Sequence, residues 1–529
     1  MLRRLMILAA VAALAFSSCA IRTNAQGLPP VQKPFEPKVP QGTGACSIDR
    51  PCTEVAPLII SSALGASPLE SNLRELTDVI GGRVTGTAAN DKAVEWAVEA
   101  FRRAGVDEVH TEKFTVPVSW AEGRTHLDVI APEAFPVHLV SIGWSPATPA
   151  GGITANLVDG GMGEEADFAR LGDMANGAIV LMHTNTLKTW DDLMNEYYYE
   201  PAIIDRAVKA GAAAILWMST RPYMLLYRHN LSVTGELERL PQAVVAREDA
   251  MRLARFIAAG QPVKVRLDMP NKIGGPAESE NVVAEIRGSV KPDEFVLLGA
   301  HLDSWELGTG ALDDGCNAAM VIDAARAIRA SGSVPKRSIR FVLFSGEEQG
   351  MLGSWAYTEA HRTELDKMDA AIIFDSGDGR VTGYSLGGRK DIAGTVTQAL
   401  EPLSTFGPFE NTDDADLGSD NFDFLLEGVP TLASNQEPDD YMMNYHAASD
   451  TFDKVDFAQL KHNEAVAAVT TYAVADLPEK LGPRQNREQI EKLLEDTGLK
   501  KEMQAAGVWP LWVDGRRGRQ PEAGDARRQ

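Results

Sequence analysis

The sequence has too little positive charge for a nucleic-acid-binding protein. Its 529 residues include 51 Lys and Arg against 74 Asp and Glu, a formal net charge of -23 at pH 7. Contacts to phosphates need clustered Lys and Arg, so this balance excludes nucleic acid as a partner. Hydrophobic residues make up 44% of the chain, as in ordinary soluble globular proteins, and the length allows two or three domains.

The sequence also lacks an apolar run of membrane-spanning length. Its longest apolar run lies near the start of the chain and is too short to cross a bilayer. Two arginines precede the apolar run Leu5–Phe16, which has the length of a signal-peptide core. We expect residues 1–25 to be a signal peptide and the mature protein to be exported, either periplasmic or secreted. The alternative is a lipoprotein signal that ends before Cys19, in which case a lipid on Cys19 would hold the protein at a membrane.

Cysteine is scarce, with four residues in the whole chain. We expect Cys46 and Cys52, which flank Pro51, to pair in an oxidising compartment. Two free thiols in a loose segment are the alternative. Cys316 would be left unpaired.

Composition and periodicity divide the remaining chain into four parts. The apolar spacing from Leu69 to Ala104 is largely helical, and Gly105 follows as a stop signal. The expected bounds are 26–55 for a linker, 56–126 and 277–482 for one interrupted catalytic domain, 127–276 for an inserted domain, and 483–529 for a C-terminal extension whose Arg- and Gly-rich end from Gly515 we expect to be disordered.

Strands and helices alternate regularly in the second half of the chain. Apolar runs at 295–299, 339–344 and 371–374 alternate with helical patterns such as 317–330. This alternation predicts βαβ units and an α/β fold with a mainly parallel central sheet. The inserted region instead has short apolar runs, such as 178–182, between Gly-containing turns, which favours a β-rich unit that shapes access to a site elsewhere.

Side chains that can bind a metal follow three of these apolar runs. They are His301 and Asp303 after the first run, Glu347 and Glu348 after the second, and Asp375 after the third. Because carboxyl ends of parallel strands meet at one edge of a sheet, we expect these side chains to converge there. Each alone has an ordinary explanation, such as a surface pair, a helix start or a turn, and only their convergence favours a site.

Two residues from loops join this candidate set. Asp313 lies in the turn before the helix that starts near Asn317, and His446 lies in a loop after the strand-like run 430–433. Imidazoles and carboxylates without cysteine suit Zn²⁺ in a catalytic, incompletely filled site. Two Zn²⁺ ions nearly balance the charge of three carboxylates, which favours a pair of ions where water is excluded.

The adjacent residues Glu347 and Glu348 are expected to have different roles. In an extended segment, neighbouring side chains point in opposite directions. One carboxylate can therefore bind a metal while the other faces the water as a general base. Periodicity does not say which is which.

Five short segments carry a specific resemblance to a known family. They are Gly299–Trp305 (GAHLDSW), Gly310–Gly315 (GALDDG), Phe344–Gly350 (FSGEEQG), Phe374–Ser376 and Tyr445–His446. In this order they resemble the zinc metallopeptidase family that contains carboxypeptidase Q and the cocatalytic zinc aminopeptidases, and the HLDSW form is most similar to the carboxypeptidase Q branch. The resemblance, which extends over residues 60–480, implies a three-layer α/β/α zinc-exopeptidase (phosphorylase/hydrolase-like) fold with a protease-associated domain at 127–276.

The resemblance also implies a ligand set for two Zn²⁺ ions per chain. Asp313 would bridge both ions. His301 and Asp375 would complete one ion, and Glu348 and His446 would complete the other.

Three further roles follow from the same resemblance. Glu347 would be the general acid/base, Asp303 would hold the second nitrogen of the His301 imidazole, and Tyr445 would donate to the tetrahedral oxyanion. The Asp313–Asp314 peptide bond would be cis. One departure from the family pattern is Cys316–Asn317, where small residues are expected; it alters local packing and adds a thiol near the metals, but it removes no ligand.

These inferences predict an exported exopeptidase that hydrolyses dipeptides or short peptides as a carboxypeptidase or dipeptidase. We also expect a homodimer. An aminopeptidase of the same family is the nearest rival, because no Arg or Lys lies within the motif segments, although Arg389 and Lys390 follow in a loop. A non-catalytic peptide-binding relative is a second rival, but such a protein would have lost ligands. A single-zinc acyltransferase of the glutaminyl-cyclase type is a third, which the acidic pair and Asp313 disfavour.

Overall fold

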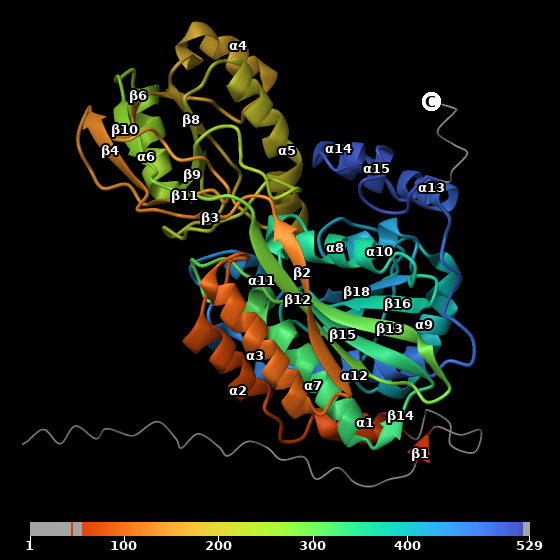
Figure 1. The fold of residues 1–529 in the computed structure, drawn as a ribbon. Helices are drawn as coiled ribbons and strands as arrows, with labels where there is room; N and C mark the ends of the chain where they lie inside the picture. Colours follow the sequence, from red (N-terminus) through yellow and green to blue (C-terminus); the bar gives the residue numbers. More distant parts are fainter. Residues whose placement is uncertain (1–43, 46–54, 522–529) are drawn as a thin grey trace, which may run out of the picture. The chain divides into compact units, whose positions relative to one another are not determined.

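The computed structural model describes residues 44–45 and 55–521 of the chain, coloured along the sequence in Figure 1. The chain divides into two units, residues 1–36 and residues 37–529. All described residues belong to the second unit. No helix among them combines the length and the apolar character that crossing a membrane would need.

The predictions about the beginning of the chain fall outside the described residues. They concern the signal peptide, the fate of Cys19 and the pairing of Cys46 with Cys52. Within the expected linker, strand β1 (Gly44–Ala45) pairs in parallel with β14 (Ser333–Val334).

A seven-stranded sheet forms the centre of the larger lobe, in the strand order β17-β18-β16-β13-β15-β12-β2. The strands are β2 (Glu108–Val116), β12 (Ala277–Ile286), β13 (Lys291–His301), β15 (Arg337–Phe344), β16 (Met368–Ile373), β17 (Val381–Ser385) and β18 (Thr431–Gln436).

The four central strands of this sheet are parallel, and the outer strands are antiparallel. Strands β15, β13, β16 and β18 pair in parallel, whereas β2, β12 and β17 run antiparallel to their neighbours. The predicted parallel sheet is therefore confirmed at its centre. Its edges differ because an apolar pattern marks a strand without marking its direction.

Helices cover both faces of the sheet, which gives the predicted α/β/α layers (Figure 1). On one face, α7 (Cys316–Ala330) packs against α1 (Ala56–Ala63), α3 (Ala88–Ala104) and α12 (Phe457–Ala475). On the other face, α8 (Leu352–Ala360) packs against α10 (Asn421–Leu426).

The predicted helix 69–104 is present but interrupted. Helix α2 (Leu69–Arg74) continues as a π-helical turn to Ile80, and α3 starts only at Ala88. The side chain of Thr87 caps α3 by accepting a hydrogen bond from Asn90 N. Gly105 ends it with φ 84°, a left-handed conformation that glycine adopts without strain, as predicted.

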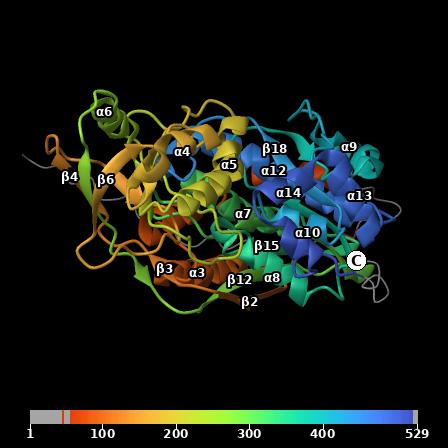
Figure 2. The same ribbon diagram turned by 90° about the horizontal axis from the view of Figure 1, so that it is seen from above.

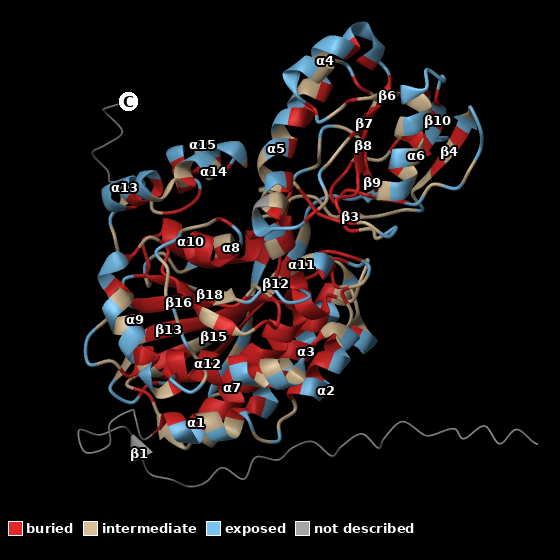
Figure 3. Ribbon diagram, turned by 180° about the vertical axis from the view of Figure 1, so that it is seen from behind, coloured by how far each residue is buried: buried red, intermediate tan, exposed pale blue. Residues whose placement is uncertain are grey.

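Alternate side chains of the central strands pack into two cores. On β13, Val296 and Leu298 belong to the core under α7 and α12, while Phe295 and Leu297 belong to the core on the opposite face. Most residues of these strands are buried (Figure 3). Burying one such side chain contributes about 1.5–3 kcal/mol, so the strands hold their carboxyl ends at fixed positions.

Between β2 and β12 the chain forms a second seven-stranded sheet, in the order β4-β10-β6-β7-β8-β9-β5. Its strands are β4 (His126–Ala131), β5 (Leu139–Ser141), β6 (Ile153–Asp159), β7 (Ile179–Met182), β8 (Ala214–Met218), β9 (Gln242–Val245) and β10 (Lys264–Asp268). The chain leaves and returns through β3 (Trp120–Ala121) and β11 (Lys272–Ile273), which pair antiparallel.

Three helices accompany this second sheet, so the inserted region is an α/β unit rather than a mainly β one. Helix α6 (Arg247–Ala258) packs on one face, and α5 (Trp190–Lys209) packs on the other; α4 (Glu165–Leu171) precedes them. Helix α5 contains an internal Pro201 and three consecutive tyrosines, which obscure its helical pattern in the sequence.

Smaller helices complete the chain. Helix α9 (Ala393–Ala399) and α11 (Tyr441–Asn444) belong to the larger lobe. At the C-terminal end, α13 (Arg487–Thr497), α14 (Leu499–Ala505) and α15 (Trp509–Val513) follow one another. Helix α14 packs against α5 of the inserted region (Figure 2).

The prediction of disorder from Gly515 onward is wrong for residues 515–521. The Arg517 side chain is fully buried, and its guanidinium donates hydrogen bonds of 2.7 and 2.8 Å to the two carboxylate oxygens of Asp423. An arginine with such a bidentate carboxylate partner can be buried in the core. The segment from Gly515 is therefore ordered up to residue 521, although its composition resembles that of a solvated tail. Residues 522–529 lie outside the described chain.

Candidate metal centre

The carboxyl ends of three neighbouring strands bring the first predicted residues to one edge of the central sheet. His301 is the last residue of β13, Glu347 and Glu348 follow β15, and Asp375 follows β16. The three strands pair in parallel, so their ends lie side by side.

Asp313 and His446 reach this edge from loops. Asp313 lies in the turn before α7, and its peptide bond to Asp314 is cis, as the resemblance implies. His446 lies two residues after α11 and has φ 57°. A residue other than glycine in this left-handed region is strained, and such residues are frequent at functional sites.

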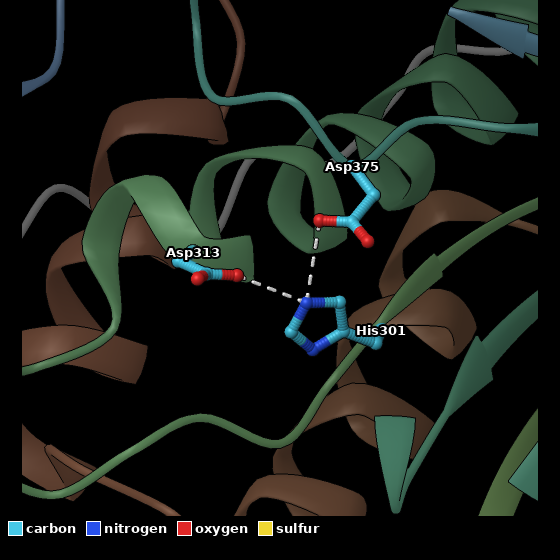
Figure 4. A group of neighbouring side chains, drawn as sticks. All are labelled: His301, Asp313 and Asp375. Atoms are coloured by element: carbon cyan, nitrogen blue, oxygen red, sulfur yellow. Dashed lines mark hydrogen bonds and ion pairs between the residues drawn. The ribbon is translucent and has the colours of Figure 1, made fainter. Parts of the chain in front are cut away.

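His301 and two carboxylates form the first group of metal-binding side chains (Figure 4). The Nε2 atom of His301 lies 3.1 Å from Oδ1 of Asp313 and 3.4 Å from Oδ1 of Asp375. All three side chains point toward a common centre.

His446 forms a second group with the other oxygen of the same aspartate. Its Nε2 atom lies 3.2 Å from Oδ2 of Asp313 and 2.9 Å from Oε2 of Glu348. Asp313 therefore offers one oxygen to each histidine and links the two groups.

Several oxygens in these groups are buried without accepting a hydrogen bond. They are Oδ2 of Asp313 and both carboxylate oxygens of Glu348. Although His446 Nε2 is close to both residues, the contacts do not have the directions of hydrogen bonds. Because buried carboxylate oxygens are costly when unsatisfied, a cation is the partner that this arrangement fits.

The pKa values of the acidic groups point the same way. Burial, reinforced by the Asp313 carboxylate, raises the pKa of Glu348 to about 7. Burial also raises the pKa of Glu347 well above its usual range, with Asp375 and Glu348 adding to the effect. More acid is buried here than the two imidazoles neutralise, and divalent cations would stabilise the ionised forms. The donor set of two imidazoles and three carboxylates suits zinc.

The contact between Asp303 and His301 differs in detail from the expectation. His301 Nδ1 lies 3.0 Å from the backbone oxygen of Asp303, and 3.6 Å from its carboxylate Oδ1. The Asp303 carboxylate accepts hydrogen bonds from Glu347 N at 3.3 Å and from Thr85 Oγ1 at 2.9 Å. Asp303 thus holds the imidazole mainly through its main chain, while its side chain ties the strand end of His301 to Glu347.

The two adjacent glutamates diverge for a different reason from the one expected. They lie in a short 3₁₀ helix, Glu347–Gln349, and not in an extended segment. Gly346 precedes it with φ 83°, a conformation that turns the chain sharply after β15. Glu348 contacts His446 and also lines the adjoining pocket, whereas Glu347 lines the pocket without belonging to either metal-binding group.

The departure at Cys316–Asn317 supports the turn that carries the metal-binding residues. Asn317 Nδ2 donates to Asp314 Oδ1 at 2.6 Å, and Asp314 Oδ2 accepts from His301 N at 3.1 Å. Cys316 is fully buried, its Sγ faces Leu312 O, and burial raises the pKa of its thiol well above its usual value. This thiol therefore remains protonated and belongs to neither metal-binding group.

Sequence reasoning missed Asp450, which holds the Asp313 turn. Its Oδ1 accepts hydrogen bonds from Ala311 N at 3.1 Å and Leu312 N at 2.7 Å, and its Oδ2 accepts one from Asp313 N at 3.2 Å. Nothing in the spacing of Asp450 marks this role, because its partners are backbone groups distant in sequence. Arg83 was missed for the same reason: it donates to Thr309 O and Gly310 O.

An open pocket with a cavity volume of about 100 Å³ adjoins the second group. Its lining residues include Glu347, Glu348, Tyr445 and His446 from the larger lobe. The remainder come from the inserted region, from the 350–351 and 417–418 segments and from the end of α14: Met194, Tyr197, Asn230, Leu231, Ser232, Val233, Gly350, Met351, Leu417, Gly418 and Ala506. A concave surface that combines apolar side chains with a few polar groups is typical of small-molecule sites.

The basic residues considered as a binding group for a substrate carboxylate lie elsewhere. Arg389 is paired with Asp391 at 2.7 Å, and Lys390 is paired with Asp413 at 2.7 Å. Neither lines the pocket.

We expect zinc to stabilise this protein more as the pH rises. Burial raises the pKa of Glu348, and also of Asp450, to about 7. A carboxyl group whose pKa is raised by folding contributes its stability below the unfolded value near 4, and loses it as the pH rises through the folded value. The metal-free chain should therefore lose stability between about pH 4 and 7, whereas zinc stabilises the ionised groups.

The measurement is the melting temperature with and without zinc across this pH range. The difference between the two forms should widen with pH. Burial also raises the pKa of Glu238 in the inserted region to about 7, but Glu238 belongs to neither metal-binding group, so we expect its effect to cancel in the difference. A difference that narrows as the pH rises would contradict the expectation.

Comparison with known proteins identifies relatives of the chain. The profile of peptidase family M28 matches residues 281–471. Carboxypeptidase Q of Mus musculus is 31% identical over 411 residues, which cover 77% of this chain and 85% of that protein.

Solved structures agree in fold. A peptidase M28 precursor from Shewanella amazonensis SB2B superposes with a TM-score of 0.73 at 28% identity, covering 82% of this chain and 99% of that one. BSAP, a zinc aminopeptidase from Bacillus subtilis, superposes with a TM-score of 0.62 at 22% identity, covering 76% and 93% of the two chains. At that identity the second likeness concerns the fold alone.

Proposed function

Because this chain belongs to peptidase family M28 and is a metallo-exopeptidase, we propose that it cleaves dipeptides or short peptides with two zinc ions, as an exported enzyme. One observation carries the proposal: Asp313 offers one carboxylate oxygen to the His301 group and the other to the His446 group. Two neighbouring catalytic ions need a ligand of this kind. The export is inferred from the apolar run at residues 5–16.

The side chains around this centre can carry out the steps of hydrolysis. Zinc ions held there would supply Lewis acidity, which polarises a carbonyl oxygen and acidifies a water molecule. Glu347 takes the proton of the attacking water and returns it to the leaving amine. The Tyr445 hydroxyl, on the same pocket wall, donates a hydrogen bond to the carbonyl oxygen as negative charge develops on it.

The test of this proposal combines metal analysis with a panel of dipeptides. We expect two zinc ions per chain and turnover that a chelator abolishes and zinc restores. A single bound ion would favour the single-zinc acyltransferase, and zinc binding without turnover would favour a non-catalytic peptide-binding protein.

The Asn230 side chain of the pocket is suited to a substrate carboxylate. Its Nδ2 donates to Ser232 O at 2.9 Å and keeps a second N–H for a ligand. Together with the similarity to carboxypeptidase Q, this amide supports a carboxypeptidase or dipeptidase. The inserted region would then act like a protease-associated domain that shapes access to the site.

An aminopeptidase is the second candidate, and the charge of the pocket favours it. No Arg or Lys is among the described residues that line the pocket, whereas Glu347 and Glu348 are. An acidic wall attracts the protonated amine at the start of a peptide.

Dipeptides blocked at one end distinguish these two candidates. For a carboxypeptidase or dipeptidase, amidation of the carboxylate should raise KM by about tenfold or more, the loss expected for one hydrogen bond to a charged group. Asn230→Ala should cause a similar loss for the free dipeptide and none for the amidated one, which serves as the matched control. If acetylation of the amine abolishes cleavage while amidation does not, the enzyme is an aminopeptidase.

A further inference from the structure

One side chain of the inserted region reaches the candidate metal centre. Tyr197 lies on α5, about 250 residues before the loop of Tyr445 and His446, and it lines the pocket together with both of them. Its hydroxyl lies 3.0 Å from the hydroxyl of Tyr445 and 3.5 Å from Nδ1 of His446. Tyr197 therefore touches one residue of each kind: a metal-binding imidazole and an oxyanion donor.

The inserted region and the His446 loop are held together by more than this contact. Arg228 N donates to His446 O at 3.0 Å, and Tyr227 forms a β-bridge with Ala447. The buried guanidinium of Arg221 donates to Tyr445 O at 3.3 Å. The loop that presents His446 is thus ordered against the inserted region, and the distance to Tyr197 is set by the fold.

The helix that carries Tyr197 is fixed by buried polar contacts on either side of it. Glu196 Oε1 accepts from Arg221 at 2.8 Å, and Glu200 Oε2 lies 3.1 Å from His229 Nε2. The ring of Tyr197 packs against the ring of His229, with centroids 5.6 Å apart. These neighbours leave the hydroxyl of Tyr197 directed at the metal centre.

The geometry gives the hydrogen bonds a direction. His446 turns Nε2 toward Asp313 and Glu348. A neutral imidazole that binds a metal through Nε2 carries its proton on Nδ1. Among the described residues, the Tyr197 oxygen lies 3.5 Å from Nδ1 and can accept this N–H, which leaves the proton of Tyr197 free for the oxygen of Tyr445.

In this order the Tyr445 proton has no acceptor among residues 55–521, where Tyr197 is the contact of the Tyr445 hydroxyl. The Tyr445 oxygen accepts from Tyr197, so its O–H is left to donate to a group in the pocket. In the proposed mechanism Tyr445 donates to the developing oxyanion. The relay, which we define as the hydrogen bonds from His446 to Tyr197 and from Tyr197 to Tyr445, would keep the Tyr445 hydroxyl directed at that oxyanion.

We propose that Tyr197 is a positioning residue of this enzyme: it accepts the Nδ1–H of His446, donates to Tyr445, and so holds both the imidazole ligand and the oxyanion donor. The proposal rests on the proposed function. If Tyr197 has this role, the inserted region positions residues of the metal centre in addition to lining the pocket. Outer partners of metal-binding histidines commonly affect metal affinity or activity by about 10- to 100-fold.

The helix itself supplies a matched control. Tyr197→Phe removes the hydroxyl and keeps the ring against His229. Tyr199→Phe makes the same change two residues away on α5, where the side chain is 63% exposed. Both variants, together with Tyr445→Phe and the double variant Tyr197→Phe/Tyr445→Phe, are compared with the wild-type full chain.

The first measurement is zinc affinity, obtained by competition with a chelating dye. In Tyr197→Phe one of the two ions should dissociate at a concentration of free zinc about tenfold higher than in Tyr199→Phe, because His446 has lost its outer partner. The second measurement is kcat on a dipeptide at saturating zinc, so that both sites are filled. Here Tyr197→Phe should lower kcat by about tenfold with KM within about twofold, while Tyr199→Phe matches the wild type.

The double variant decides whether Tyr197 acts through Tyr445. If it does, the double variant turns over no more slowly than Tyr445→Phe alone, since the relay ends on a hydroxyl that is already absent. The proposal is overturned if the loss of kcat in the double variant equals the product of the losses in the two single variants. It is also overturned if Tyr197→Phe binds zinc as tightly as Tyr199→Phe. The wild-type chain reports separately on the proposed function: two bound zinc ions and turnover support it, and their absence would overturn both.

Discussion

Glu347→Gln is expected to retain two zinc ions per chain and to lower kcat by about 10²–10⁴-fold, the usual contribution of a general acid/base. Glutamine keeps the size and the pocket position of Glu347 but cannot take a proton. The Glu347 side chain is absent from both metal-binding groups, so the ions should stay. The measurement is zinc content together with kcat on a dipeptide.

Two further variants sharpen this prediction. Glu359→Gln makes the same exchange on the exposed surface of α8 and should leave turnover unchanged. Glu348→Gln should instead weaken the ion expected at Asp313 and His446, because Glu348 Oε2 lies 2.9 Å from His446 Nε2. Turnover near the wild-type value in Glu347→Gln would remove this residue from the mechanism.

The contrast between the two glutamates shows a limit of sequence reasoning. Their adjacency after an apolar run predicts that both lie at the edge of the sheet, and they do. Their separation follows from the 3₁₀ turn between Gly346 and Gly350, which both have positive φ. The two side chains therefore have different surroundings, as predicted, but the chain does not adopt the extended conformation on which that prediction rested.

The convergence of His301, Asp303 and Asp375 could be predicted because it depends on local rules. Each follows a buried strand, and neighbouring parallel strands end at one edge. Asp313 and His446 lie in loops, so the sequence offers them as candidates without a strand end to place them, and their roles as ligands came from the resemblance to a known family. Their positions depend on long-range hydrogen bonds, such as those from the Asp313 turn to Asp450, which no local pattern encodes.

The inserted region is the part of the chain where the structure differs most from what the sequence predicts. Its apolar runs predict strands, and the run at 178–182 corresponds to β7. The contribution of Tyr197 to the metal centre could not be predicted, because it depends on how α5 packs against the His446 loop. A tyrosine among three in a row carries no signal that distinguishes it from its neighbours.

The inserted region also explains why the second group depends on more of the chain than the first. His301 and Asp375 belong to the ends of two adjacent strands, which the cores on both faces of the sheet hold in place. The backbone of His446 is held instead by Arg228 and its neighbours in the inserted region. Movement of that region would therefore affect the His446 group while leaving the His301 group intact.

Asp313→Asn is expected to weaken both zinc sites at once and to lower kcat by more than about 10²-fold. Asp313 is shared between the groups, with one oxygen 3.1 Å from His301 Nε2 and the other 3.2 Å from His446 Nε2. An amide keeps the shape of the side chain, but it replaces one oxygen by an NH₂ group that cannot bind a cation. Removal of even an outer partner of a ligand costs about 10- to 100-fold in affinity or activity, so loss of a shared ligand should exceed this.

Variants at single-group ligands provide the comparison that isolates sharing. Asp375→Asn removes a ligand from the His301 group alone and should leave the second ion bound, whereas Asp293→Asn, at an exposed position near the start of β13, should bind two ions normally. Zinc content by mass spectrometry should therefore fall from two to one in Asp375→Asn and toward none in Asp313→Asn.

Zinc should raise the melting temperature of the wild type, because an ion present at 100 times its Kd adds about 2.7 kcal/mol to the free energy of unfolding. Asp313→Asn should lose this gain, and one tightly held ion in that variant would show that the two groups bind independently.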